Sequence, residues 1–129
     1  MTKFIWTAAT VFVMFLIFHV YAEAQQIVPQ WELIGKSDQG EFVYTDLKSK
    51  QTIKEPKYSS AWFRFVKDDE DIQIRFYSTF ENKAVCYDLI RLNGKLIPVT
   101  EKTCFLVQKN TIGEEIFRVL IVFYIVSNE

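Results

Sequence analysis

The stretch from Ser60 to Phe80, SAWFRFVKDDEDIQIRFYSTF, holds the residue types best suited to binding another protein. Tryptophan, tyrosine and arginine are the residues most enriched at the energetic hot spots of protein interfaces. The acidic centre, Asp68 to Asp71, consists of residues that strands reject, so it predicts a four-residue turn between two strands. Because side chains alternate along a strand, four of these residues share one face of the hairpin. The candidate binding site is therefore Trp62, Arg64, Arg75 and Tyr77.

A four-residue turn fixes the register that we expect for this hairpin. The expected cross-strand pairs are Lys67 with Ile72, Phe65 with Ile74, Phe63 with Phe76, Arg64 with Arg75, and Trp62 with Tyr77. Like charges directly opposite each other destabilise a sheet, so we expect an acidic partner or an intramolecular carboxylate beside the arginines. The alternative is that the arginines only stack on the two rings of the site, or that the terminal helix or the 48–60 connection covers them.

The rest of the chain offers little catalytic chemistry. Its single histidine is His19, close to the N-terminus, which excludes Ser-His-Asp and Cys-His arrangements and the usual zinc and copper ligand sets from the domain. GxSxG, SxxK, HExxH and phosphate-binding glycine loops are absent from the sequence. The acidic cluster lacks the ligand spacing of an EF-hand. We therefore expect a protein that is not an enzyme and that binds no cofactor or metal.

The charge balance also argues against a nucleic-acid partner. The formal net charge is −1, which gives no long-range field to attract a polyanion. Two cysteines, Cys86 and Cys104, are present. A lone pair in a small exported domain usually forms a disulfide, worth about 3 kcal/mol in the chain-entropy model. The alternative is two free, buried thiols, because sequence spacing does not show whether the Cβ atoms face each other.

The N-terminus has the form of an export signal. Lys3 precedes an apolar run from Phe4 to Val20, and Ala22-Glu23-Ala24 has the small-x-small pattern that signal peptidase accepts. We predict a signal peptide over residues 1–24, a single domain over 25–129, and export to the periplasm, the cell surface or the medium. After cleavage no transmembrane segment is expected. The alternative is an uncleaved anchor, since the run approaches the ~18 to 20 residues that span a bilayer.

Turn signals divide the domain into short strands. Apolar and β-branched runs predict strands over 31–36, 41–47, 61–67, 72–80, 84–91, 96–99 and 103–108, with a short edge strand around Thr52 and Ile53. Asn93-Gly94 suits a type I′ hairpin turn. Thr111 with Glu114 matches a capping box, and apolar residues spaced by four follow it. The fold class is thus α+β, a small antiparallel sheet of about six strands with one C-terminal helix packed on it.

The apolar segment from Val119 to Val126 allows three interpretations. It is the buried end of the helix, a final central strand, or an exposed segment that binds a partner. Burial within the fold is the interpretation that we favour, because apolar runs are more often core than interface. At this length the segment is too short to cross a membrane.

Five short segments form a pattern: WELIG at 31–35, FVYTDLKS at 42–49, AWFRFV at 61–66, NGKLI at 93–97 and NTIGEEIFRVL at 110–120. The pattern resembles the surface-adhesin protein E family of bacterial exported proteins, from about Trp31 to Leu120. The last segment is the most specific, because it is similar to the one that opens the family's terminal helix. The resemblance implies a small antiparallel sheet with one helix across it. It also implies adhesion to host extracellular-matrix or plasma proteins, the role of the best-known member.

Two departures from the family affect these expectations. Relatives often place a cysteine at the end of the terminal helix, where this chain has Val119 and Leu120, so the Cys86–Cys104 pair implies a different disulfide topology. The chain also lacks the cysteine of a lipoprotein signal. The resemblance then implies a protein that is free in the periplasm or secreted rather than anchored by lipid.

Two functions follow as hypotheses, and both expect a protein partner and no nucleic acid. The first is an exported, non-enzymatic binding protein, a surface adhesin that engages host extracellular proteins through the candidate site. The alternative is a periplasmic structural or envelope-assembly protein. In that role Val119 to Val126, or an edge strand, would dock onto a larger complex by strand addition.

Overall fold

The computed structural model of the protein describes residues 28–128, so the predicted signal peptide, 1–24, lies outside the described residues. The secondary structure of the described chain is β1 (Trp31–Lys36), β2 (Phe42–Asp46), the 3-10 helix η1 (Leu47–Ser49), β3 (Gln51–Ile53), β4 (Tyr58–Lys67), β5 (Glu70–Ser78), β6 (Ala84–Leu92), β7 (Lys95–Leu106) and α2 (Ile112–Ser127).

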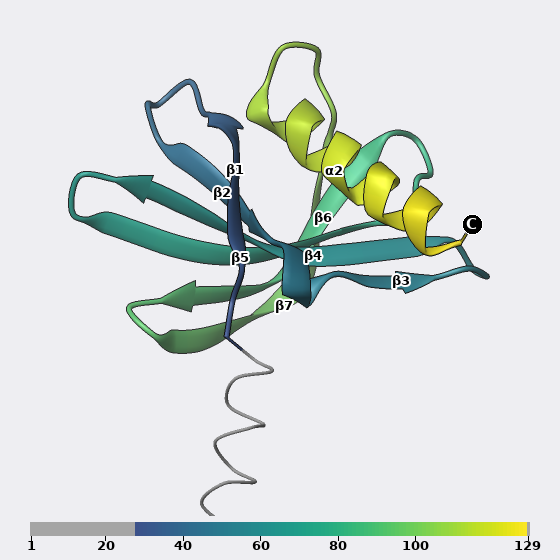
Figure 1. The fold of residues 1–129 in the computed structure, drawn as a ribbon, viewed down its shortest axis with the longest axis horizontal. Helices are drawn as coiled ribbons and strands as arrows, with labels where there is room; N and C mark the ends of the chain where they lie inside the picture. Colours follow the sequence, from purple (N-terminus) through teal and green to yellow (C-terminus); the bar gives the residue numbers. More distant parts are fainter. Residues whose placement is uncertain (1–27, 129) are drawn as a thin grey trace, which may run out of the picture.

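All seven strands form one antiparallel sheet, in the order β1-β2-β4-β5-β6-β7, with β3 pairing with the first residues of β4. The helix α2 lies across one face of this sheet, while the β4–β5 and β6–β7 hairpins point away from its C-terminal end (Figure 1). The predicted α+β fold is therefore confirmed. The sheet has seven strands where about six were expected. The edge strand around Thr52 forms, and the segments 96–99 and 103–108, predicted as two strands, join into the single strand β7.

The register of the β4–β5 hairpin differs from the prediction by two residues. The turn consists only of Asp68 and Asp69, with Asp68 at φ 51°, and the last two residues of the acidic cluster belong to β5. A two-residue turn with positive φ follows the twist of the strands better than a longer loop. The predicted opposition of Arg64 to Arg75 is consequently wrong. The observed pairs are Arg64 with Gln73, Trp62 with Arg75, and Ser60 with Tyr77.

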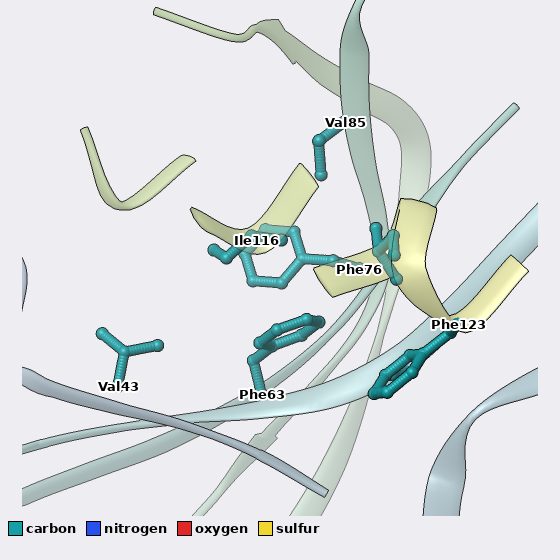
Figure 2. Close-up of a cluster of buried hydrophobic side chains, with 8 residues drawn as sticks. Val43, Phe63, Phe76, Val85, Ile116 and Phe123 are labelled. Carbon is teal, nitrogen blue, oxygen red and sulfur yellow. The ribbon is translucent and has the colours of Figure 1, made fainter. Parts of the chain in front are cut away.

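A shift of two residues preserves which face each side chain occupies, because the side-chain period of a strand is two. Phe63 and Phe76 point toward α2, as expected, and form an edge-to-face pair with centroids 5.5 Å apart. Figure 2 shows these rings in the core with Ile116 and Phe123 reaching them from the helix. Burying such side chains stabilises the fold by about 1.5 to 3 kcal/mol each.

The helix begins where the sequence predicts. Thr111 is its N-cap, and its Oγ1 accepts a hydrogen bond from the Glu114 backbone N–H at 3.3 Å. The helix then continues without interruption to Ser127, which decides between the three interpretations of the terminal apolar segment. Leu120 and Phe123 are buried, whereas other residues of that segment are exposed on the outer side of the helix. Burial of the segment is therefore only half realised.

The β6–β7 hairpin carries the disulfide. Asn93 and Gly94 form its turn with φ of 52° and 78°, as the Asn-Gly signal predicts. Cys86 and Cys104 lie directly opposite each other on the two strands and are bonded, so the predicted disulfide is confirmed. Beyond this pair the ladder is irregular, because the residues between Pro98 and Thr103 on β7 have no partner on β6.

Candidate protein-binding face

The sheet face opposite α2 carries a continuous layer of aromatic and charged side chains, which we call the aromatic–arginine face. Strand alternation builds it, since each core residue such as Phe63 or Phe76 has neighbours that point the other way. All four predicted site residues belong to this face. Its members are Trp31, Tyr44, Tyr58, Trp62, Arg64, Asp71, Gln73, Arg75, Tyr77, Asp88 and Arg91.

Arg64 is held from two sides. Its Nε donates to Asp71 Oδ1 at 2.8 Å and its Nη2 donates to Oδ2, so the contact is bidentate. Its guanidinium also lies over the Trp31 ring, 5.8 Å from the centroid. The hydrogen bonds from Arg64 lower the pKa of Asp71 from its ordinary value, and those to Asp71 raise the pKa of Arg64. The expected intramolecular carboxylate is therefore the last residue of the acidic cluster.

Arg75, on β5, forms an equivalent ion pair with Asp88 on the neighbouring strand β6. Its Nε donates to Asp88 Oδ1 at 2.9 Å and its Nη2 donates to Oδ2. Asp88 occupies an irregular position of β6, where the register with both neighbours shifts between Tyr87 and Leu89. The extra residue turns the carboxylate toward Arg75. Hydrogen bonding to Asp88 raises the pKa of Arg75.

Arg91 is a member that the sequence analysis missed. Its guanidinium lies over the Trp62 ring at 4.5 Å from the centroid, and its Nη1 donates to Gln73 Oε1 at 2.8 Å. The predicted stacking of Arg64 or Arg75 on Trp62 is thus wrong, because Arg91 occupies that position. Arg91 lies opposite Gln73 only through the β5–β6 register, which depends on the irregularity at Asp88. Local sequence signals carry no trace of that irregularity.

Tyr77 completes the face beside the disulfide. It lies opposite Cys86 on β6, and its ring stacks on Tyr58 with centroids 5.7 Å apart. Burial, and then the negative charge of Asp88, raise the pKa of Tyr77 above its ordinary value, so the phenol stays neutral and can donate a hydrogen bond.

The face is half-exposed, and ion pairs between its own residues stabilise it. The side chains of Arg64 and Arg75 are 34% and 29% exposed, and the helix lies on the other side of the sheet and does not cover them. The two ion pairs neutralise Arg64 and Arg75, whereas Arg91 forms no ion pair with residues 28–128. The arrangement offers rings and oriented guanidinium groups for recognition.

Comparisons with known proteins add no relative, since the chain matches no family model, no curated protein and no solved structure. Among residues 28–128, no helix has both the length and the apolar character needed to cross a membrane.

Proposed function

We propose that this chain is an exported, non-enzymatic binding protein, a surface adhesin that engages host extracellular proteins through the aromatic–arginine face. The observation that carries the proposal is the composition of this face and the way its side chains hold one another in place. Tryptophan, tyrosine and arginine side chains, the types most enriched at hot spots, are concentrated on the side of the sheet that α2 does not cover.

Preorganisation supports the proposal further. Binding costs less conformational entropy when the side chains of the site are already ordered. Bidentate ion pairs hold Arg64 and Arg75 in place before any partner binds. Export is supported by the Cys86–Cys104 disulfide, which is typical of oxidising compartments. The family resemblance supplies the class of partner, host extracellular-matrix or plasma proteins.

A binding assay on purified extracellular-matrix and plasma proteins tests the proposed function. We expect Trp62→Ala to lower affinity for the bound partner by about 2 kcal/mol, the hot-spot range. Trp62 is chosen because its ring carries the cation–π contact of Arg91 and so orders the centre of the face. Lys95→Ala, at the exposed start of β7, is the control and leaves affinity unchanged. Equal binding by wild type and Trp62→Ala would remove this face from consideration.

Location is tested separately by protease shaving of intact cells, followed by mass spectrometry of the released peptides. Release of peptides from Trp31 to Lys109 supports an adhesin outside the cell. Release only after the outer membrane is opened supports the second candidate, a periplasmic structural or envelope-assembly protein. The observation that favours this second candidate is the exposed outer side of α2.

A further inference from the structure

The C-terminal half of α2 exposes a ridge of branched aliphatic side chains. Val122, Ile125 and Val126 are 49%, 52% and 56% exposed, while Leu120 and Phe123 on the other side of the same turns are buried in the core. The α2 ridge, as we call these three residues, is therefore left over after the helix has packed on the sheet. It lies on the side of the molecule opposite the aromatic–arginine face.

Lysines flank the α2 ridge on both sides. Lys50 places its Nζ 5.5 Å from the centroid of the Phe123 ring. Lys54 comes close through its carbonyl, which accepts a hydrogen bond from the Tyr124 hydroxyl at 3.2 Å. Lys57 and Lys83 line a groove of about 360 Å³ whose walls are Phe80, Phe117, Ile121 and Tyr124. We call Lys50, Lys54, Lys57 and Lys83 the lysine collar.

The lysine collar is a local excess of positive charge on a protein of net charge −1. All four lysines are exposed, and none of them forms an ion pair with residues 28–128. Glu55 and Glu81 are the acidic residues of the same connections. The acidic turn at Asp68 and Asp69 lies at the far end of β4, away from the C-terminal end of α2 (Figure 1).

The types of residue distinguish this surface from the aromatic–arginine face. Protein interfaces are enriched in aromatic residues and arginine and depleted in lysine, and that description fits the sheet face. A convex aliphatic ridge with compact, strongly hydrated ammonium groups beside it fits the boundary between lipid headgroups and acyl chains. Anionic lipids attract lysines near a membrane surface at about 1 kcal/mol each.

We propose that the α2 ridge and the lysine collar dock the protein on an anionic membrane surface. The ridge enters the headgroup boundary, and the lysines contact anionic headgroups on both sides of it. This orientation turns the aromatic–arginine face away from the membrane. The proposal concerns residues that the proposed adhesin site does not use, so the two fail or succeed separately.

Vesicle co-sedimentation tests the proposal. The protein recovered from cells, with the N-terminus it carries there, is mixed with vesicles of phosphatidylcholine alone or of phosphatidylcholine with phosphatidylglycerol. We expect binding that requires phosphatidylglycerol. It should weaken when salt rises from about 0.1 M to about 1 M, because the Debye length falls from roughly 10 Å to roughly 3 Å.

Two variants locate the binding surface. Lys54→Gln/Lys57→Gln is expected to lower the partition coefficient by about fivefold per lysine. Val122→Ser/Ile125→Ser/Val126→Ser should lower it at least about tenfold, because the buried apolar area is lost. Since these residues are exposed, both variants should keep the thermal unfolding midpoint of the wild type, and the lysine variant suffices if the ridge variant does not fold.

Matched controls carry the same kinds of change elsewhere. Lys95→Gln/Lys102→Gln removes two exposed lysines, and Leu33→Ser/Leu96→Ser removes two leucines that are 54% and 50% exposed. Both controls should bind vesicles as the wild type does. Equal binding to both kinds of vesicle, no binding at low salt, or equal losses in controls and test variants would overturn the proposal. If the protein binds no vesicles, the membrane proposal is wrong, and an acidic protein becomes the next partner to test on this surface.

Discussion

At the scale of single residues, Asp71 links the turn, the strand and the candidate site. It is the one member of the acidic cluster whose carboxylate receives a bidentate hydrogen bond from Arg64. Its place in β5 rather than in the turn follows from the short turn, and it supplies the charge that Arg64 needs on a half-exposed sheet face. One carboxylate thus stabilises the strand end and orients the guanidinium.

Asp71→Asn should lower the free energy of unfolding at neutral pH by up to about 1 kcal/mol, the range of a half-exposed ion pair. Because the folded-state pKa of Asp71 lies below its ordinary value of 3.8, its contribution is complete above the unfolded-state pKa. It is lost as pH falls through the lower folded-state pKa. Urea unfolding of both proteins across this range measures the difference, which should vanish in acid. Asp69→Asn, in the exposed turn, is the control and should keep the stability of the wild type at neutral pH, because Asp69 forms no ion pair among residues 28–128.

Two adjacent serines in β4 have side-chain hydroxyls that find no hydrogen-bond partner within the described part of the chain. Ser59 and Ser60 are fully buried, and neither hydroxyl has a partner among the described residues. An unpaired buried polar group costs about 1 to 3 kcal/mol. Ser59→Ala should therefore leave stability unchanged or raise it by up to about 1 kcal/mol in a denaturant titration.

Ser49→Ala provides the opposite case for the same substitution. The Ser49 hydroxyl donates to the Asp46 carbonyl at 2.7 Å and accepts from the Trp62 N–H at 2.8 Å. Its removal should cost roughly 1 kcal/mol. A loss of stability in Ser59→Ala as large as that in Ser49→Ala would show that Ser59 has a partner after all.

At the scale of elements, the disulfide joins β6 and β7 next to Tyr77. Cys86→Ser/Cys104→Ser should lower the free energy of unfolding by at most about 3 kcal/mol, the chain-entropy value for a loop of this length. The sequence separation is 18, and the hairpin already restricts that loop. Thermal unfolding with and without a reductant measures the effect. The reductant should lower the midpoint of the wild type, because Cys104 is exposed, and leave that of the variant unchanged.

Local signals predicted the elements better than their pairing. Asn93-Gly94 gave the β6–β7 turn and Thr111 the start of α2, because each rests on the backbone preference of one or two residues. The β4–β5 register was wrong by two because any of the acidic residues can occupy a turn, and the Arg64–Asp71 pair selects the shorter one. The faces survived that error, so the four predicted site residues still lie together.

Arg91 shows why the rest of the site could not be predicted. Its position over Trp62 depends on two strand pairings and on the irregularity at Asp88 between them. These pairings are long-range contacts that packing and an ion pair determine. They produce no periodic pattern in the sequence from which they could be predicted. The division of the terminal apolar segment into a buried and an exposed side likewise depends on where one helix crosses a wider sheet.

At the scale of the whole molecule, residue types separate by side. Arg64, Arg75 and Arg91 lie with tryptophan and tyrosine rings on the sheet face, and the lysine collar lies around the exposed end of α2. The two proposals together put the partner on one side of the molecule and the membrane on the opposite side, so that docking on the membrane would turn the aromatic–arginine face outward. We expect Trp62→Ala to lose partner binding and keep vesicle binding. We expect Lys54→Gln/Lys57→Gln to lose vesicle binding and keep partner binding.

The irregular edge strand β7 has a consequence for self-association. Pro98 has no N–H to offer, the residues after it leave the ladder, and Glu101 and Lys102 stand exposed on the same rim. Charges, prolines and bulges on an outer strand deny a second sheet the row of hydrogen bonds that it would need to grow. We therefore expect that even high protein concentration would not lead to fibres that grow through β7.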